Sequence, residues 1–149
     1  MRALIALLLL PSLMAAAPAR DWEATVNRTA AGAYVLGNPA APTKLVEYAS
    51  YTCSHCAAFS GESAGVLKGQ MVKSGSTSLE LRHLVRDTAD LAAAVIARCT
   101  GPRFFQTSAT IFAEQPRWLP RAIEFQQTNE GRLAMYPACL LYTSDAADE

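Results

Sequence analysis

The sequence predicts a mixed α/β fold whose centre is a β-strand, a helix and a second strand that runs parallel to the first. Residues 43–50 are largely apolar and contain β-branched side chains, which is typical of a buried strand. Residues 78–85 alternate between polar and apolar side chains and predict another strand. A helical pattern over residues 54–73 lies between them, and a strand, a helix and a strand at this spacing form a βαβ unit with parallel strands.

Residues 1–19 have the layout of a secretory signal peptide. Arg2 gives a positive start, residues 3–10 form an uninterrupted apolar run, and small residues precede a favourable cleavage position after Ala19. The apolar run is shorter than the roughly 20 residues that a membrane-spanning helix needs. The alternative is a buried N-terminal helix. The pattern favours export, so we expect a mature protein in a bacterial periplasm, without a membrane span after signal cleavage.

Residues 20–86 are expected to form the N-terminal part of the folded domain. An irregular lead-in segment at residues 20–29 precedes a first strand over residues 32–37. The turn at residues 38–42 contains two prolines, which cannot continue a strand ladder. The helix at residues 54–73 carries three glycines, each of which costs about 1 kcal/mol relative to alanine.

Residues 87–138 are expected to form an inserted helical subdomain. Asp87 is a suitable helix cap, and the helix at residues 88–98 is predicted to bury a stripe of bulky apolar side chains. A further strand would be expected here if the βαβ pattern simply repeated, but the sequence continues with helical patterns and prolines. The bulky stripe consists of Leu91, Val95 and Ile96, and the further helices are predicted at residues 103–114, 122–127 and 131–135, around Pro116 and Pro120.

Three kinds of side chain outside the central unit have conventional interpretations. The aromatic residues of the helical block are expected to form its core, with Phe104, Phe105, Phe112 and Trp118 among them. Cys99 is expected to be a small buried apolar side chain. His83, in a strand of alternating polarity, is expected to be solvated or hydrogen-bonded.

The end of the chain does not look like natural protein sequence. Residues 139–149 resemble, residue for residue, the translation of a transposon adapter used in sequencing libraries. We therefore expect the natural sequence of this fragment to end near Ala138, with an adapter-derived tail after it. Cys139 is then uninformative, and the natural cysteines are Cys53, Cys56 and Cys99.

The charge composition gives no indication of a nucleic-acid partner. The chain has 13 basic and 13 acidic residues, and its formal net charge is zero. Proteins that bind nucleic acid through the phosphates carry a clustered excess of basic side chains. The sequence predicts no nucleic-acid partner.

The most informative feature is a Cys-x-x-Cys pair, Cys53 and Cys56, where the strand pattern of residues 43–50 gives way to a helix. A thiol at a helix N-terminus meets the positive end of the helix dipole, which favours the thiolate. We expect Cys53 to be accessible to attack and Cys56, one turn further on, to be more protected. His55 lies between them and can favour the Cys53 thiolate by its charge or by a hydrogen bond. The pattern is typical of a redox dithiol.

Other interpretations of the cysteine pair are weaker but remain alternatives. A zinc site needs more ligands, and the sequence has no second Cys-x-x-Cys or histidine pair. A non-enzymatic metal-binding module would use Cys53, His55 and Cys56. A structural disulfide, for example in a peptide-binding or chaperone domain, would constrain the unfolded chain little across so short a loop. The redox interpretation requires no cofactor and no resident metal.

The segments at residues 34–39, 44–48 and 53–56 together resemble the start of a DsbA-like thiol:disulfide oxidoreductase of the thioredoxin superfamily. This resemblance implies a thioredoxin-like fold with an inserted helical subdomain. It also implies an exported enzyme that donates its disulfide to folding proteins. The oxidase direction is favoured, and a periplasmic reductase or isomerase is the alternative. The expected partners are cysteine-containing substrate proteins and a membrane or soluble protein that restores the redox state.

The resemblance also implies roles for single residues. Cys53 matches the attacking cysteine, Cys56 the resolving cysteine and His55 the histidine that tunes the pair. Glu47, six positions before Cys53, matches a buried acid that helps to move protons at the active site. From the residues alone, Glu47 could equally be an edge-strand carboxylate in water.

The resemblance covers residues 33–135 and departs from the family pattern at its end. Family members place a cis-proline and a strand opposite the cysteine pair, followed by a closing strand and helix. Pro137 follows a helical pattern and does not match that proline. We therefore expect the sheet to be incomplete at the C-terminus.

Overall fold

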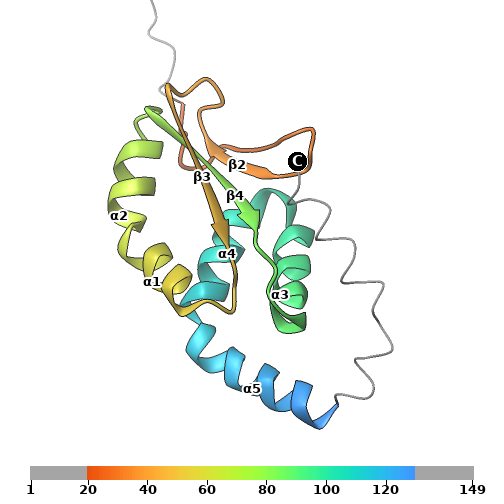
Figure 1. Cartoon of the computed structure of the whole chain (residues 1–149). Helices are drawn as coiled ribbons and strands as arrows, with labels where there is room; N and C mark the ends of the chain where they lie inside the picture. The colour runs from red at the N-terminus through yellow and green to blue at the C-terminus, as the bar shows by residue number, and fades with distance from the viewer. Residues whose placement is uncertain (1–19, 130–149) are drawn as a thin grey trace, which may run out of the picture.

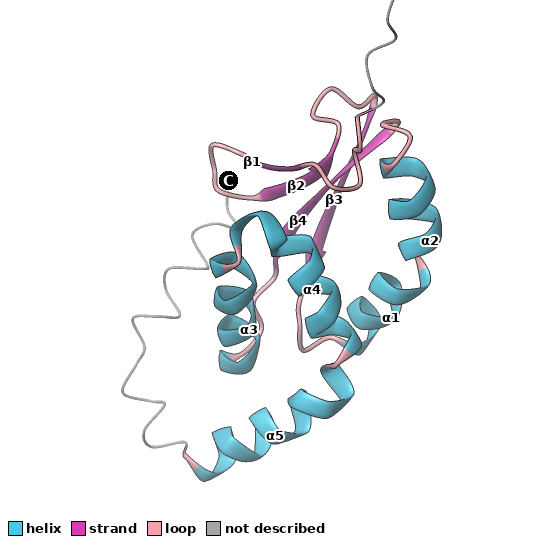
Figure 2. Ribbon diagram, turned by 180° about the vertical axis from the view of Figure 1, so that it is seen from behind, coloured by secondary structure: helices cyan, strands magenta, loops and turns pink. Residues whose placement is uncertain are grey.

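The computed structural model describes residues 20–129 and contains one sheet with helices packed against one of its faces (Figure 1). Seen from behind, α4 lies in front of the sheet (Figure 2). The mixed α/β class predicted from the sequence is confirmed. The strands are β1 (Val26–Arg28), β2 (Tyr34–Gly37), β3 (Thr43–Ala49) and β4 (Thr77–His83), and the helices are α1 (Ser54–Glu62), α2 (Ala64–Val66), η1 (Leu67–Val72), α3 (Thr88–Cys99), η2 (Gly101–Arg103), α4 (Phe104–Ala113) and α5 (Gln115–Thr128).

The strands follow the order β1-β2-β4-β3 across the sheet. Strands β3 and β4 are parallel, as the βαβ pattern predicts, and Leu45 lies opposite Leu79. Strand β2 pairs with β4 in the antiparallel direction. The prediction of an irregular segment at residues 20–29 was wrong in part, because Val26–Arg28 forms β1 and pairs antiparallel with β2. A three-residue edge strand is too short to produce a recognisable alternation.

The prediction that the strand before the cysteine pair is buried was wrong. Strand β3 lies at the edge of the described sheet, and only its last residue, Ala49, is buried. Val46 and Tyr48 are 40% and 48% exposed. Apolar composition alone does not distinguish a strand covered on both faces from one whose outer edge has no neighbour within residues 20–129.

The predicted helix over residues 54–73 is present but interrupted. Helix α1 ends at Glu62, and the chain continues through the short α2 into η1, a π-helix. In η1 the Lys73 N–H donates to the Lys68 carbonyl five residues earlier, at 3.1 Å. Leu67 and Val72 from this segment are buried against the sheet.

Helix α3 begins where the sequence predicts, since the Asp87 side chain caps it by accepting from the Asp90 N–H at 2.9 Å. The prediction that α3 buries a stripe of bulky side chains was wrong for two of its three residues. Leu91 is buried, but Val95 and Ile96 are 50% and 60% exposed. The face that packs against the rest of the protein is instead formed by small residues, which allow close approach: Ala89, Ala93, Ala94 and Ala97.

Cys99 lies on the opposite side of α3 and is exposed, which contradicts its predicted burial. It comes four residues after Val95, so the two side chains share a helix face. Once the alanine face is inward, this face points outward. Cys99 is therefore a free surface thiol.

Helix α5 runs from Gln115 to Thr128 without the interruption expected around the prolines. Pro116 stands in the first turn, where a helix tolerates proline because the first N–H groups have no intrahelical acceptor. Pro120 lies inside the helix and removes one donor there.

The core lies between the sheet and the helices and is rich in aromatic side chains. Phe104, Phe105 and Phe112 are buried as predicted, and Trp118 packs against them. Tyr34 stacks on Phe104 with ring centroids 4.3 Å apart. His83 also belongs to this region. Both of its ring nitrogens are buried without a hydrogen-bond partner, which contradicts the prediction that they are solvated or satisfied.

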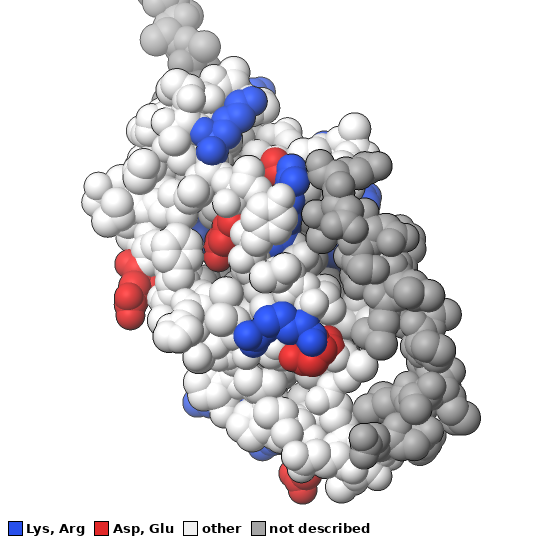
Figure 3. Space-filling model, in the orientation of Figure 1, with Lys and Arg blue, Asp and Glu red and all other residues white. Residues whose placement is uncertain are grey.

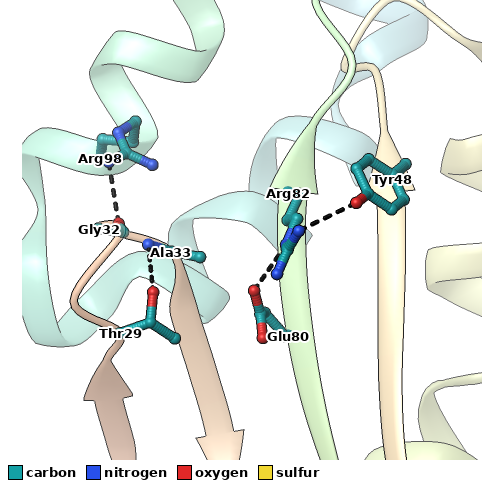
Figure 4. Close-up of polar contacts among 7 residues, drawn as sticks. All are labelled: Thr29, Gly32, Ala33, Tyr48, Glu80, Arg82 and Arg98. Carbon is teal, nitrogen blue, oxygen red and sulfur yellow. Dashed lines mark hydrogen bonds and ion pairs between the residues drawn. The ribbon is translucent and has the colours of Figure 1, made fainter. Parts of the chain in front are cut away.

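On the face of the sheet opposite the helices, Tyr48, Glu80 and Arg82 form a polar cluster (Figure 4). Arg82 on β4 donates from Nε to Glu80 at 2.7 Å and from a terminal nitrogen to the Tyr48 hydroxyl at 3.0 Å. Long side chains therefore cover part of the face opposite the helices.

Several predictions fall on residues outside the described range. They are the signal peptide at residues 1–19, the helical piece at 131–135, the adapter-like tail at 139–149 and the interpretation of Pro137. Among residues 20–129, none of the helices combines the length and the apolar composition required to cross a bilayer.

Candidate active site

Cys53 occupies the N-cap position of α1, at the carboxyl end of β3 (Figure 1). Its backbone is extended, with φ −92° and ψ 118°, and the helix begins at the next residue. No side chain caps this end of the helix. The first N–H groups of α1 therefore have no side-chain acceptor, and Cys53 stands at the end of the helix that carries the positive partial charge.

The surroundings of Cys53 favour its thiolate. The backbone N–H of Cys56, with its thiol, lowers the pKa of Cys53, and the N–H of His55 and the charge of Arg86 act in the same direction. Hydrogen bonds from backbone N–H groups stabilise the charged form of an acid more than its neutral form. Cys53 is only partly buried, so another thiol can reach it.

His55 acts here through its main chain. Its side chain is exposed, and its backbone N–H is what contributes to lowering the Cys53 pKa. The tuning role expected of the His55 imidazole stays a prediction. The positive charge of Arg86 makes the smallest of the contributions that lower the Cys53 pKa.

Cys56 lies one turn inside α1 and packs partly against the core. Burial raises the pKa of its thiol, and the negative charges of Cys53 and Glu47 act in the same direction, while the Ser50 N–H opposes them. The two cysteines are free thiols, and their environments shift the thiol pKa in opposite directions. The pKa of the Cys53 thiol is thus shifted down and that of the Cys56 thiol up.

Glu47 is half-buried, on the side of β3 that faces the helices, opposite Leu81 of β4. Burial raises the pKa of its carboxyl, and the positive charge of Lys68 partly offsets that effect. Burial in turn lowers the pKa of Lys68. The position combines features of both earlier interpretations, because Glu47 is on an edge strand and is still partly removed from water.

The turn that leads into Cys53 is held by a buried carboxylate. Asp90, on α3, is 1% exposed and accepts from the Tyr51 N–H at 2.7 Å and the Arg86 N–H at 3.1 Å. The Ser50 hydroxyl also donates to it. Burial raises the pKa of Asp90, and these hydrogen bonds counteract the increase.

Arg86 and Asp87 extend this network towards Thr52. Arg86 donates to the Ser50 hydroxyl at 3.0 Å and to the Thr52 hydroxyl at 3.2 Å. Thr52 in turn donates to Asp87 at 2.7 Å. These contacts keep the guanidinium of Arg86 beside the reactive turn.

Helices α4 and α5 contact the same turn from the other side. The Tyr51 hydroxyl pairs with Ser108 on α4 at 2.6 Å. Gln115, the first residue of α5, donates from its side-chain amide to the carbonyls of Tyr51 and Cys53. All three long helices of the helical block therefore contact the turn.

The described residues do not assemble a metal site. No group of three or more His, Cys, Asp and Glu side chains between residues 20 and 129 lies close enough together to bind a metal ion. The metal-binding alternative therefore has no complete ligand set in this part of the chain.

On the face shown in Figure 3, acidic and basic side chains are interspersed.

The chain resembles known proteins in both sequence and structure. A family model described as Thioredoxin matches residues 29–147. A solved protein-disulfide isomerase from Novosphingobium aromaticivorans is 40% identical, with a TM-score of 0.61, over 66% of this chain and 50% of that one. A variant of alpha-DsbA1 from Wolbachia pipientis is 27% identical, with a TM-score of 0.56, over the same shares of the two chains.

Curated relatives match a shorter stretch. Candidate protein-disulfide oxidoreductases of Rickettsia typhi and Rickettsia prowazekii are each 34% identical over 86 residues, which is 56% of this chain. That match covers 32% of each relative, so the chain spans about a third of the length of these proteins.

Sequence reasoning found the two cysteines but missed most of the groups around them. Arg86, Asp90 and Gln115 were not singled out, and Asp87 was interpreted only as a helix cap. A polar residue in the apolar stretch of α3 was the one available signal for Asp90, while Gln115 carried none.

Proposed function

Because the chain belongs to the thioredoxin family and to its DsbA-like oxidoreductases, we propose that it exchanges a Cys53–Cys56 disulfide with cysteines of folding proteins. The observation that carries the proposal is the opposite perturbation of the two thiols, with the Cys53 pKa lowered and the Cys56 pKa raised. A dithiol exchanger needs a reactive outer thiol and an inner thiol that resolves the mixed disulfide.

The reaction proceeds in two exchanges. A substrate thiolate attacks the sulfur of Cys53 in the Cys53–Cys56 disulfide, which forms a mixed disulfide and releases Cys56 as a thiolate that takes up a proton. A second substrate thiolate then attacks the substrate sulfur of the mixed disulfide and expels Cys53 as a thiolate. The substrate loses two electrons to form its disulfide, and the cysteine pair gains them.

The leaving group of the second step supports the oxidase direction. Groups that lower the Cys53 pKa stabilise the reduced protein and make Cys53 a better leaving group. The backbone N–H groups and Arg86 supply this stabilisation. Reductase or isomerase activity uses the same two steps in other orders and is the alternative outcome of the test below.

A redox titration of the full chain against glutathione tests both the activity and its direction. We expect a Cys53–Cys56 couple less negative than the roughly −270 mV of thioredoxin. A more reducing couple would contradict the oxidase direction, and a pair that does not exchange would contradict the activity. The matched control is Cys99→Ser, which removes the exposed thiol of α3 and should leave the couple unchanged, whereas Cys53→Ser should abolish it.

Glu47 is proposed to assist proton transfer at Cys56. Its half-buried carboxylate is close enough for its charge to raise the Cys56 pKa. Replacement by glutamine removes that charge, so the pKa of Cys56 should fall. A pH titration of thiolate absorbance in Cys53→Ser, with and without Glu47→Gln, measures this change, and identical titration curves would rule out the coupling.

We also propose that the protein acts after export, in the periplasm. The leader pattern of residues 1–19 supports this proposal, and disulfide exchange is most useful in an oxidising compartment. Expression of the full chain in a bacterium should yield a periplasmic protein whose mass shows cleavage after Ala19. Recovery of the uncleaved chain from the cytoplasm would contradict it.

A further inference from the structure

Among the residues of the helical block, which comprises α3, α4 and α5, Gln115 makes the most direct contact with the reactive cysteine. It is 5% exposed and stands at the first position of α5. Its Nε2 donates to the Tyr51 carbonyl at 2.6 Å and to the Cys53 carbonyl at 3.1 Å. A primary amide nitrogen has two N–H donors, and both are used here.

These two hydrogen bonds fix the orientation of the Tyr51–Thr52 and Cys53–Ser54 peptide groups. The Cys53 carbonyl also accepts from the Ala57 N–H at 3.1 Å, which is the first hydrogen bond of α1. The orientation of this carbonyl determines how the N-cap residue is joined to the helix. It therefore helps to set where Cys53 stands relative to the first N–H groups of α1.

The two peptide groups that flank the Tyr51 Cα are each held by a side chain that is distant in sequence. Its carbonyl accepts from Gln115, and its N–H donates to Asp90 at 2.7 Å. The main-chain hydrogen bond from the Cys53 N–H to the Ser50 carbonyl, at 3.1 Å, closes the turn locally but does not set its position relative to the helical block. Gln115 is the only side chain among the described residues for which a hydrogen bond to the Cys53 main chain is recorded.

From this geometry we infer that Gln115 is a positioning residue for Cys53, which the helical block uses to hold the reactive cysteine in the orientation needed for exchange. The inference rests on the proposed function, since it concerns the redox behaviour of the same pair. Gln115 does not touch a reacting atom and acts only through the main chain of Cys53.

Two substitutions at Gln115 distinguish the effect of its N–H donors from the effect of its side-chain shape. Gln115→Met keeps the length of the side chain and removes both donors. Gln115→Glu keeps its planar shape, but its carboxylate cannot donate to a carbonyl. The matched control is Gln106→Met on α4, because Gln106 is exposed and no side-chain hydrogen bond is recorded for it.

The readout is the equilibrium between the Cys53–Cys56 pair of the purified full chain and glutathione. In this exchange two glutathione thiols are oxidised to one glutathione disulfide as the protein disulfide is reduced. A buried hydrogen bond has a net effect of about 1 kcal/mol, which corresponds to about fivefold in an equilibrium constant. We expect both Gln115 variants to be less oxidising than the wild type by about this factor, and Gln106→Met to match the wild type.

A merely structural role would lower the thermal stability of the variants without moving this equilibrium. Unchanged equilibrium constants in folded Gln115 variants would therefore overturn the inference. If Gln115→Met does not fold, Gln115→Glu decides by the same criterion. A wild type that does not exchange with glutathione would overturn the proposed function and the inference together, so the two failures are distinguishable.

Discussion

The turn at residues 50–53 and strand β3 just before it are adjacent in sequence but are held very differently. Ser50 and Tyr51 are buried, and side chains from α3, α4 and α5 bond to the turn. Val46 and Tyr48 of β3 are exposed, and one edge of the strand has no neighbour among the described residues. The turn that leads into Cys53 is therefore fixed by α3, α4 and α5, whereas the strand before it is held mainly by β4.

Removal of the Asp90 carboxylate should have the largest effect on the turn. Asp90→Ala leaves the Tyr51 and Arg86 N–H groups and the Ser50 hydroxyl without their acceptor. Leaving buried donors unpaired should reduce the free energy of unfolding by about 3 kcal/mol. Urea denaturation measures this loss, with the exposed Glu114→Ala as control, and a loss below about 1 kcal/mol would show that the turn does not depend on Asp90.

A second large effect should appear in acid, at the residue that ends β4. Burial lowers the pKa of His83 to about 4, below the value of about 6.5 for the unfolded chain. The folded state therefore resists protonation, and stability should fall by up to about 3 kcal/mol between pH 6.5 and pH 4 as the unfolded state takes up the proton.

The raised pKa values of Glu47 and Asp90 act in the opposite direction, because their folded forms take up protons first as the pH falls. The useful quantity is therefore the difference between the wild type and His83→Phe. Stability measured from pH 7 to pH 4 should decline less in the variant. Parallel curves would show that His83 does not titrate in this way.

A moderate effect should distinguish two tyrosine hydroxyls. Tyr51→Phe removes the contact with Ser108, whose hydroxyl still donates to the Phe104 carbonyl at 2.8 Å. The loss should be about 1 kcal/mol. Tyr48→Phe, on exposed β3, should change stability by less than about 0.5 kcal/mol. Equal losses in urea denaturation would remove the contrast between turn and strand.

The smallest effect should come from β3 itself. Val46→Thr replaces a methyl group by a hydroxyl on an exposed strand and should stay within about 0.5 kcal/mol of the wild type. Val72→Thr, at a fully buried position, should lose at least about 1 kcal/mol by the same exchange. A comparable loss at Val46 would show that its side chain is covered in solution.

Local sequence patterns predicted the order of the main elements and the position of the cysteine pair. Asp87 was recognisable as a cap, and the βαβ unit as a parallel pair, because both depend on neighbouring residues. The inward face of α3 was assigned wrongly, because bulky residues mark a buried face only where there is room for them. Alanines bring α3 close to the rest of the protein and leave Val95, Ile96 and Cys99 outside.

The contacts that complete the site could not be predicted in this way. Asp90 bonds to a residue 39 positions earlier and Gln115 to one 64 positions earlier. No periodicity relates residues across such distances. The burial of His83 has the same cause, since it depends on Tyr51 and Phe104 packing beside it.

The two hydrogen bonds that hold the main chain of Tyr51 have a consequence for how the protein folds. Strand β3 and helix α1 come early in the chain, but the partners of Tyr51 come only with α3 and α5. Contacts between residues far apart form late, because closing a long loop costs entropy before the contact forms. The thiol of Cys53 should therefore acquire its reactivity at the end of folding, and its alkylation rate during refolding should rise together with the protection of α5.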